Sequence, residues 1–246
     1  MSQTVARAIE ILELVARRTR TLGETAAHLD VHRSTALRLL RTLVDGGLVR
    51  HLPDGKYGVG YRLAGLAQLA SEQFDLKQVA HPFLNELSQA TGHTVHLASH
   101  DNKQIIYVDK VEPAATVRLY SQIGLPVPLH TAAASKAIMA LLPRDRTLRM
   151  LENCTYEPYT SATIVSEVEL LATLDRDAHR GWSTDDGEHE EYVNCIAAPI
   201  YDASGVVGAV SVTALKAVAG PAHLEELLPR LMTCANNIST ELGWAS

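Results

Sequence analysis

The sequence LGETAAHLDVHRSTALRLLRTLVDGG, residues 22–47, decides the fold of the N-terminal part of this chain. Apolar residues recur at helical spacing in its first eight positions, and residues 30–33 interrupt that pattern. A second helix is expected to begin at Ser34, a favourable N-cap residue, and to end at the pair Gly46 and Gly47. The stretch therefore predicts two short helices joined by a tight turn.

The second of these helices has two different faces. At 100° per residue, its apolar stripe consists of Ala36, Leu39, Leu40 and Leu43. The opposite face carries Ser34, Arg38 and Arg41, and Thr35 lies at its edge. An arginine can bond a guanine edge or hold a phosphate, and a hydroxyl group can bond either. This is the composition of a DNA-recognition helix, although a surface helix with solvated arginines has the same periodicity.

The next residues, 48–59, favour DNA recognition. They form two short extended runs around residues 53–55, Pro-Asp-Gly, which are a strong hairpin-turn signal. Arg50, His51 and Lys56 near the tip make this hairpin basic. A helix, a turn, a helix and a basic hairpin together predict a winged helix-turn-helix.

The distribution of charge supports this interpretation. The formal net charge is −6, but residues 1–70 contain ten Lys/Arg and six Asp/Glu, a net charge of +4. The remainder contains twelve Lys/Arg and twenty-two Asp/Glu, a net charge of −10. A basic module joined to an acidic one is expected if only the first part contacts phosphate.

The cysteines and the apolar runs indicate the cellular compartment in which the protein is expected. Cys154, Cys195 and Cys234 are an odd number at wide spacing, with no CxxC motif, which argues against a disulfide framework. No apolar run is long enough to span a bilayer, and the first residues lack the apolar core of a signal peptide. We therefore expect a cytoplasmic protein with no membrane association.

The rest of the pattern predicts an α+β protein whose second part has a mainly antiparallel sheet with flanking helices. Helices are expected at residues 4–16, 61–71, 76–90, 132–142, 144–152, 166–181 and 221–242. Strands are expected at residues 94–99, 104–109, 116–121, 195–201 and 206–213. The helix at 61–71 has an apolar stripe, so we interpret it as a connecting helix that partly meets another subunit. The alternative is that it packs only on its own domain.

Seven stretches, in their order and spacing, resemble the IclR family of transcriptional regulators over essentially the whole chain. They are VARAIEIL (5–12), ST with RLLRTL (34–43), YGVGYRL (57–63), TVHL (94–97), YVDK (107–110), LH with SKA (129–137) and DD with CIAAP (185–199). Each stretch is weak alone, and the combination is specific.

The resemblance implies three parts of the chain. They are a winged helix-turn-helix DNA-binding domain (1–60), a linker helix that mediates dimerisation (61–74) and a GAF-like effector-binding domain (75–246). Such regulators usually act as homodimers or dimers of dimers on palindromic operators in double-stranded DNA, where they repress or activate catabolic operons. We therefore expect a transcriptional regulator controlled by a small organic-acid effector, with no cofactor.

Two sets of site residues are expected. The DNA-binding residues are Arg33, Ser34, Thr35, Arg38, Arg41, Arg50 and Lys56. By resemblance, the effector-binding residues are Leu119, Ser121, Val127, Ala133, Ala134, Asp185, Val193, Cys195, Ser211 and Thr213. Small residues at a helix start leave N–H groups open to a carboxylate, and hydroxyls two residues apart on a strand face the same side. The chain departs from the family where Ala133 and Ser135 replace frequent glycines.

Other functions have less support in the sequence. His93, His96 and His100 match no zinc motif, so no metal is expected. If a metal were bound, Asp185 and His189 would be its best ligands. The acidic run 185–191 is interpreted as a solvated loop, and the Cys195 thiol as buried and unreactive. Without a catalytic constellation we predict no enzyme. The alternatives are a metabolic enzyme with an accessory DNA-binding domain, or an effectorless regulator acting through protein contacts.

Overall fold

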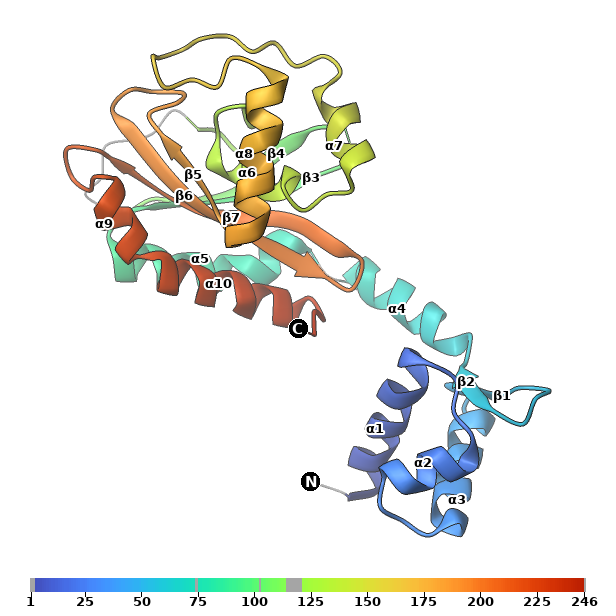
Figure 1. Cartoon of the computed structure of the whole chain (residues 1–246). Helices are drawn as coiled ribbons and strands as arrows, with labels where there is room; N and C mark the ends of the chain where they lie inside the picture. Colours follow the sequence, from blue (N-terminus) through green and yellow to red (C-terminus); the bar gives the residue numbers. More distant parts are fainter. Residues whose placement is uncertain (1–2, 74, 102, 114–120, 246) are drawn as a thin grey trace. The chain divides into compact units, whose positions relative to one another are not determined.

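The computed structural model describes residues 3–73, 75–101, 103–113 and 121–245. The chain forms two compact units, residues 1–74 and residues 75–246 (Figure 1). Within the described residues, no helix is both long enough and apolar enough to cross a membrane.

The first unit is a winged helix-turn-helix, as predicted. Its elements are α1 (Gln3–Arg17), α2 (Leu22–His28), α3 (Arg33–Asp45), β1 (Val49–His51), β2 (Tyr57–Val59) and α4 (Arg62–Gln73). The stripe of α3 is buried, and the core of the unit consists of Ile11, Val15, Leu29, Leu39, Leu40, Leu43, Val49 and Tyr57. Strands β1 and β2 pair antiparallel and form the predicted hairpin.

Side chains fix the starts of the two short helices. Thr21 caps α2 and forms a reciprocal capping box with Glu24, which satisfies two backbone N–H groups at the helix start. The prediction that Ser34 caps α3 is wrong, because His32 is the N-cap residue and its Nδ1 accepts a hydrogen bond from the Ser34 N–H. Ser34 is therefore the second residue of the helix, with its side chain on the exposed face.

Glycine closes the base of the hairpin. A Cβ atom added to Gly60 would lie 2.1 Å from the carbonyl oxygen of Gly47, so no other residue fits there without moving the backbone. This close approach lets the Gly60 N–H donate to the carbonyl of Leu48 at 2.9 Å. Helix α4 follows directly, and its Leu66 and Leu69 are 47% and 56% exposed in the single chain.

The second unit contains a five-stranded antiparallel sheet in the order β4-β3-β7-β6-β5. The strands are β3 (Thr94–His100), β4 (Ile105–Val111), β5 (Ser183–Asp186), β6 (Val193–Asp202) and β7 (Gly205–Leu215). The helices are α5 (Leu76–Thr91), α6 (Ala133–Met139), α7 (Arg144–Leu151), α8 (Glu167–Arg180), α9 (Pro221–Glu226) and α10 (Leu228–Glu241).

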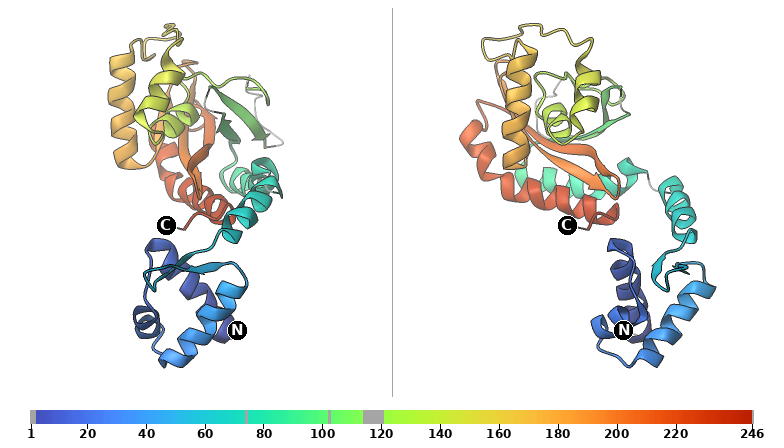
Figure 2. Two further views of the ribbon diagram at one scale, coloured as in Figure 1. Left: turned by 90° about the vertical axis from the view of Figure 1, so that its right-hand side faces the viewer. Right: turned by 45° about the vertical axis from the view of Figure 1, so that its right-hand side comes forward.

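Helices cover both faces of this sheet (Figures 1 and 2). Helices α5, α9 and α10 pack on one face, over a core built around Leu84, Ile196 and Ile238. Helices α6, α7 and α8 lie on the other face, where α6 contacts β6 and β7 and all seven of its residues are buried. The predicted α+β fold is confirmed.

Two further sequence expectations differ from the structure, and a third is not tested by it. The acidic run 185–191 is not simply a solvated loop, because Asp185 belongs to the edge strand β5 and both Asp185 and Glu188 are buried. The last helix is two helices, since Pro229 has no N–H for a helical hydrogen bond and instead occupies the first turn of α10. The strand expected at 116–121 falls mostly outside the described residues.

Candidate functional site

The first candidate site is the exposed face of α3. Arg33, Ser34, Arg38 and Arg41 are exposed, and Thr35 is half-buried. Within the described residues, none of the three arginines forms an ion pair, so their guanidinium groups are open to a charged partner. The Ser34 hydroxyl lies 2.8 Å from Nδ1 of the capping His32.

The cationic side chains of the hairpin have partners inside the chain. The Lys56 ammonium lies 2.9 Å from a carboxylate oxygen of Asp54, and the exposed Arg50 guanidinium lies 5.4 Å from the centre of the Tyr61 ring. These are surface contacts in which the charges stay hydrated, and such contacts contribute little stability. They orient both cations without neutralising the hairpin as a whole.

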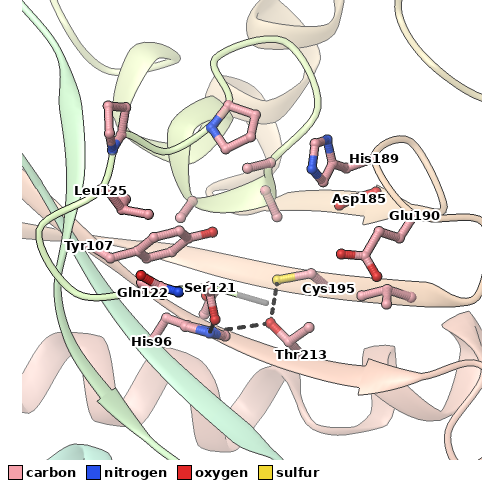
Figure 3. Close-up of a pocket in the computed structure, with 17 residues that line it drawn as sticks. His96, Tyr107, Ser121, Gln122, Leu125, Asp185, His189, Glu190, Cys195 and Thr213 are labelled. Carbon is pink, nitrogen blue, oxygen red and sulfur yellow. Dashed lines mark hydrogen bonds between the residues drawn. The ribbon is translucent and has the colours of Figure 1, made fainter. Parts of the chain in front are cut away.

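The second candidate site is a cavity of about 260 Å³ between the sheet and the start of α6 (Figure 3). Strands β3, β4, β6 and β7 form its floor, the segment 121–132 forms one side, and the turn after β5 forms the other. The lining is formed by His96, Tyr107, Ser121, Gln122, Leu125, Pro126, Pro128, Ala132, Ala133, Ala134, Asp185, His189, Glu190, Val193, Cys195, Ser211 and Thr213.

This cavity brings together most of the residues expected at the effector site. Those that line it are Ser121, Ala133, Ala134, Asp185, Val193, Cys195, Ser211 and Thr213. Val127 does not line it, because its side chain is 2% exposed and packs in the core on the α6 side of the sheet. Leu119 lies outside the described residues.

Sequence reasoning missed several polar groups of the lining, including His96, Tyr107, Gln122 and Glu190. The sequence held no local signal that His96 faces the cavity. In the sheet, His96 on β3 is the register partner of Ser211 on β7, so a residue predicted to face the cavity has His96 beside it.

Four side chains on the floor form a continuous hydrogen-bonded chain (Figure 3). The Thr213 hydroxyl donates to Sγ of Cys195 at 3.2 Å, and its oxygen lies 3.3 Å from Nδ1 of His96. The other ring nitrogen of His96, Nε2, lies 2.6 Å from Oγ of Ser121. The chain runs from β6 through β7 and β3 to Ser121, at the side of the cavity formed by the segment 121–132.

Burial determines the protonation of these groups. Burial, with a smaller effect of the Lys110 charge, lowers the pKa of His96 to about 3, so the ring is neutral near pH 7. Burial raises the pKa of the Cys195 thiol to about 12, which makes it a poor nucleophile, and raises the pKa of Tyr107 well above its usual range. The floor is therefore polar but uncharged.

A buried ion pair supports the wall that carries Asp185. The Lys136 ammonium, on α6, lies 2.5 Å from both carboxylate oxygens of Glu188, and the Lys136 side chain is only 1% exposed. The Glu188 N–H in turn donates to Oδ1 of Asp185 at 2.7 Å. Burial raises the pKa of Glu188 to about 7, although the Lys136 charge acts in the opposite direction, and burial also raises the pKa of Asp185.

A strap of irregular chain, residues 156–164, holds the same turn from outside. The Thr160 hydroxyl donates to the carbonyl of Gly187, and the Thr163 hydroxyl donates to the carbonyl of Glu188, each at 2.6 Å. The Tyr159 ring packs edge-on against His189, with ring centres 4.5 Å apart. The turn that presents His189 and Glu190 to the cavity is thus fixed by α6 on one side and the strap on the other.

This arrangement is suited to binding rather than to catalysis. The floor offers hydroxyl, imidazole and thiol groups, and the walls offer carboxylates and the small residues at the start of α6. Among the described side chains, no group of three or more His, Cys, Asp or Glu is placed to hold a metal ion. The cavity has the concave shape and convergent polar groups of a small-molecule site.

Comparison with known proteins identifies two domains in the chain. Residues 4–53 match the family model of the IclR helix-turn-helix domain, and residues 68–240 match that of the bacterial transcriptional regulator IclR C-terminal domain. The chain is 31% identical to the HTH-type transcriptional regulator XynR of Escherichia coli (strain K12), over 98% of each chain. It is 32% identical to the HTH-type transcriptional regulator KdgR of the same organism, over 91% of this chain and 86% of KdgR.

A solved structure extends this similarity to the fold. The IclR protein of Thermotoga maritima matches with a TM-score of 0.65 and 28% sequence identity, over 99% of this chain and 100% of that one. The relatives are named as transcriptional regulators and not as enzymes. The two matched domains, which together cover most of the chain, show that it belongs to the IclR family of bacterial transcriptional regulators.

Proposed function

We propose that this regulator binds a palindromic operator as a dimer or a dimer of dimers, and that a small organic acid in the cavity of the second unit controls a catabolic operon. The observation that carries the proposal is the cavity itself. Eight of the ten residues expected at the effector site line about 260 Å³ of open space, which supports the proposal. An effectorless regulator would be expected to fill this space with its own side chains.

The lining restricts the effector by size and polarity. A volume of about 260 Å³ lies at the small end of ligand pockets, which favours a compact molecule. The acidic wall residues Asp185 and Glu190 are suited to hydroxyl groups and would repel a second carboxylate. A small acid with one carboxylate and one or more hydroxyl groups fits this balance best.

On the DNA side, we assign Ser34, Thr35 and Arg38 to base edges in the major groove, and Arg33 and Arg41 to phosphates. Arg50 and Lys56 would contact the backbone or the minor groove. For Lys56 this means exchanging the Asp54 carboxylate for a phosphate, at little cost because the pair is exposed.

A palindromic operator requires two copies of the recognition helix. Helix α4 supplies an apolar surface for pairing, because Leu66 and Leu69 are about half exposed in the single chain. Two such surfaces can cover each other in a symmetric contact. The effector must then favour one arrangement of the paired DNA-binding units, since a ligand with equal affinity for both arrangements shifts nothing.

The effector assignment is tested by a thermal-shift screen of the purified protein against hydroxy, keto and aromatic acids. An acid present at one hundred times its dissociation constant adds about 2.7 kcal/mol to the stability of the unit that binds it. We expect at least one acid to raise the melting temperature and to change the affinity for DNA upstream of the gene. A flat panel, on protein that binds this DNA, would contradict the organic-acid assignment.

The DNA assignment is tested by substituting arginines on α3. Arg38→Ala should cost about 1–3 kcal/mol on the operator and relax specificity at one base position. Arg41→Ala is the matched control, because loss of a phosphate contact weakens operator and random DNA equally. Equal weakening by Arg38→Ala on both DNAs would refute its role as a base contact.

A further inference from the structure

We propose that the chain of hydrogen bonds on the cavity floor has a fixed direction, which makes Ser121 Oγ an acceptor for a hydroxyl group of the effector. The proposal rests on the proposed function and deepens it, because it names Ser121 as the residue that selects a hydroxy acid over the matching keto acid. It follows from counting the hydrogen atoms available to Cys195, Thr213, His96 and Ser121.

The direction is set at the Cys195 end. The Cys195 thiol donates to the carbonyl of Ile196 at 3.7 Å, so Sγ is left to accept the hydroxyl hydrogen of Thr213 at 3.2 Å. A hydroxyl group has one hydrogen and two lone pairs. Thr213 Oγ1 therefore meets Nδ1 of His96 only as an acceptor, and Nδ1 must carry the ring proton.

The buried imidazole of His96 links the hydrogen bond at Thr213 to the one at Ser121, so the donor at one fixes the donor at the other. His96 is 3% exposed and neutral, so it carries one N–H and one lone pair. With the proton on Nδ1, the lone pair is on Nε2, and the Ser121 hydroxyl donates to it at 2.6 Å. The single hydrogen of Ser121 is then used, and only lone pairs of its oxygen remain for a molecule in the cavity.

An oxygen that only accepts distinguishes two kinds of ligand. The hydroxyl group of a hydroxy acid can donate to Ser121 Oγ, whereas a keto oxygen at the same carbon would place lone pair against lone pair. Asp185 and Glu190 add further acceptors on the wall when ionised. The floor and the wall thus favour a ligand rich in hydroxyl groups.

If the hydrogen bonds ran in the opposite direction, His96 would be the other tautomer, and this difference can be measured. In that arrangement the His96 proton is on Nε2 and donates to Ser121, and the Thr213 hydroxyl donates to Nδ1.

In the proposed direction, Thr213→Val removes the acceptor for Nδ1–H while keeping the shape of the side chain. We expect this variant to move the proton of His96 to Nε2 and to free the Ser121 hydroxyl to donate into the cavity.

The first experiment needs no ligand. Long-range ¹H–¹⁵N correlation spectra of [¹⁵N]histidine-labelled protein distinguish the two tautomers, and His96→Gln identifies the resonances. We expect Nδ1–H in the wild type and Nε2–H in Thr213→Val. The matched control is Thr94→Val, a buried threonine on the same sheet whose hydroxyl has no partner among the described residues, and it should retain Nδ1–H. An Nε2–H wild type overturns the proposal.

The second experiment measures selectivity with matched acids, D-gluconate against 2-keto-D-gluconate and lactate against pyruvate. The wild type should bind the hydroxy acid of at least one pair about tenfold more tightly than its keto acid, the effect of one net hydrogen bond. Ser121→Ala should abolish this difference, and Thr213→Val should reduce it, because a donating Ser121 hydroxyl can bond a keto oxygen and a hydroxyl oxygen alike. A keto preference in the wild type, or no effect of Ser121→Ala, would overturn this proposal about Ser121 but leave the proposed function standing. Binding of no acid in the wider panel contradicts the proposed effector class as well.

Discussion

Removing one partner of the buried ion pair between Lys136 and Glu188 should destabilise the second unit strongly. The Lys136 side chain is 1% exposed, and both carboxylate oxygens of Glu188 lie 2.5 Å from its ammonium nitrogen. Breaking such a pair from one side costs about 3–5 kcal/mol, because the remaining charge is left without a partner. We expect Lys136→Met and Glu188→Gln each to lose about this much at pH 8.

The double variant Lys136→Met/Glu188→Gln is the matched control. It leaves no unpaired charge at this position, so it should lose much less than the sum of the two single variants. The free energy of unfolding is measured by urea titration with tryptophan fluorescence. Both tryptophans, Trp182 and Trp244, are in the second unit, so the signal reports this unit alone. Additive losses in the double variant would refute the coupling.

The pH dependence provides a second check on the same group. The pKa of Glu188 is raised to about 7 from its ordinary 4.5, so the native state holds a proton that the unfolded state has already lost. Its contribution to stability is therefore present at low pH and is lost as the pH rises through about 7. Between pH 5.5 and 7 this should lower the stability by about 2 kcal/mol, at about 1.4 kcal/mol per pH unit, and above pH 7 the loss should level off. The double variant should lack this part of the slope, and an unchanged slope would contradict the assignment to Glu188.

Three further outcomes follow from the structure. The combined variant Ser211→Ala/Thr213→Ala should abolish the melting-temperature shift caused by the stabilising acid but retain operator binding; an unchanged ligand titration would exclude this role. Thr163→Val removes the hydroxyl that donates to the Glu188 carbonyl, so it should cost about 1–3 kcal/mol and weaken acid binding, as measured by urea titration and calorimetry. Thr21→Ala should cost about 1 kcal/mol in the first unit only, visible by circular dichroism, and a shifted tryptophan transition would count against it.

Local signals in the sequence were sufficient where one side chain acts on nearby backbone. The stripe of α3, the turn of the hairpin and the glycine that ends α8 are determined by residues a few positions apart. The start of α3 shows the limit of this reasoning, since Ser34 is a preferred N-cap residue and His32 is not, yet His32 is the N-cap in the folded chain. Ser211 and Thr213 were assigned to the effector site by resemblance, and their spacing on one strand supported this; both line the cavity.

Burial of charge could not be predicted in the same way. The run Asp-Asp-Gly-Glu-His-Glu-Glu at 185–191 has the composition of a solvated loop. Its Glu188 is nevertheless buried, because the carboxylate pairs with Lys136, about fifty residues earlier in the chain. The Lys136 ammonium compensates the charge of the buried Glu188 carboxylate. The Glu188 N–H in turn donates to Oδ1 of Asp185, which lines the cavity. Pairing across the sheet places His96 beside Ser211 in the same way, through a register that only the folded chain defines.

The two ends of the cavity respond differently to acidity. Burial lowers the pKa of His96 to about 3, so its imidazole on the floor is neutral near pH 7. The carboxyl group of Glu188, behind the opposite wall, changes its charge near pH 7. Acidification through pH 7 would thus change the ion pair that braces the wall, while the His96 ring on the floor keeps its neutral form.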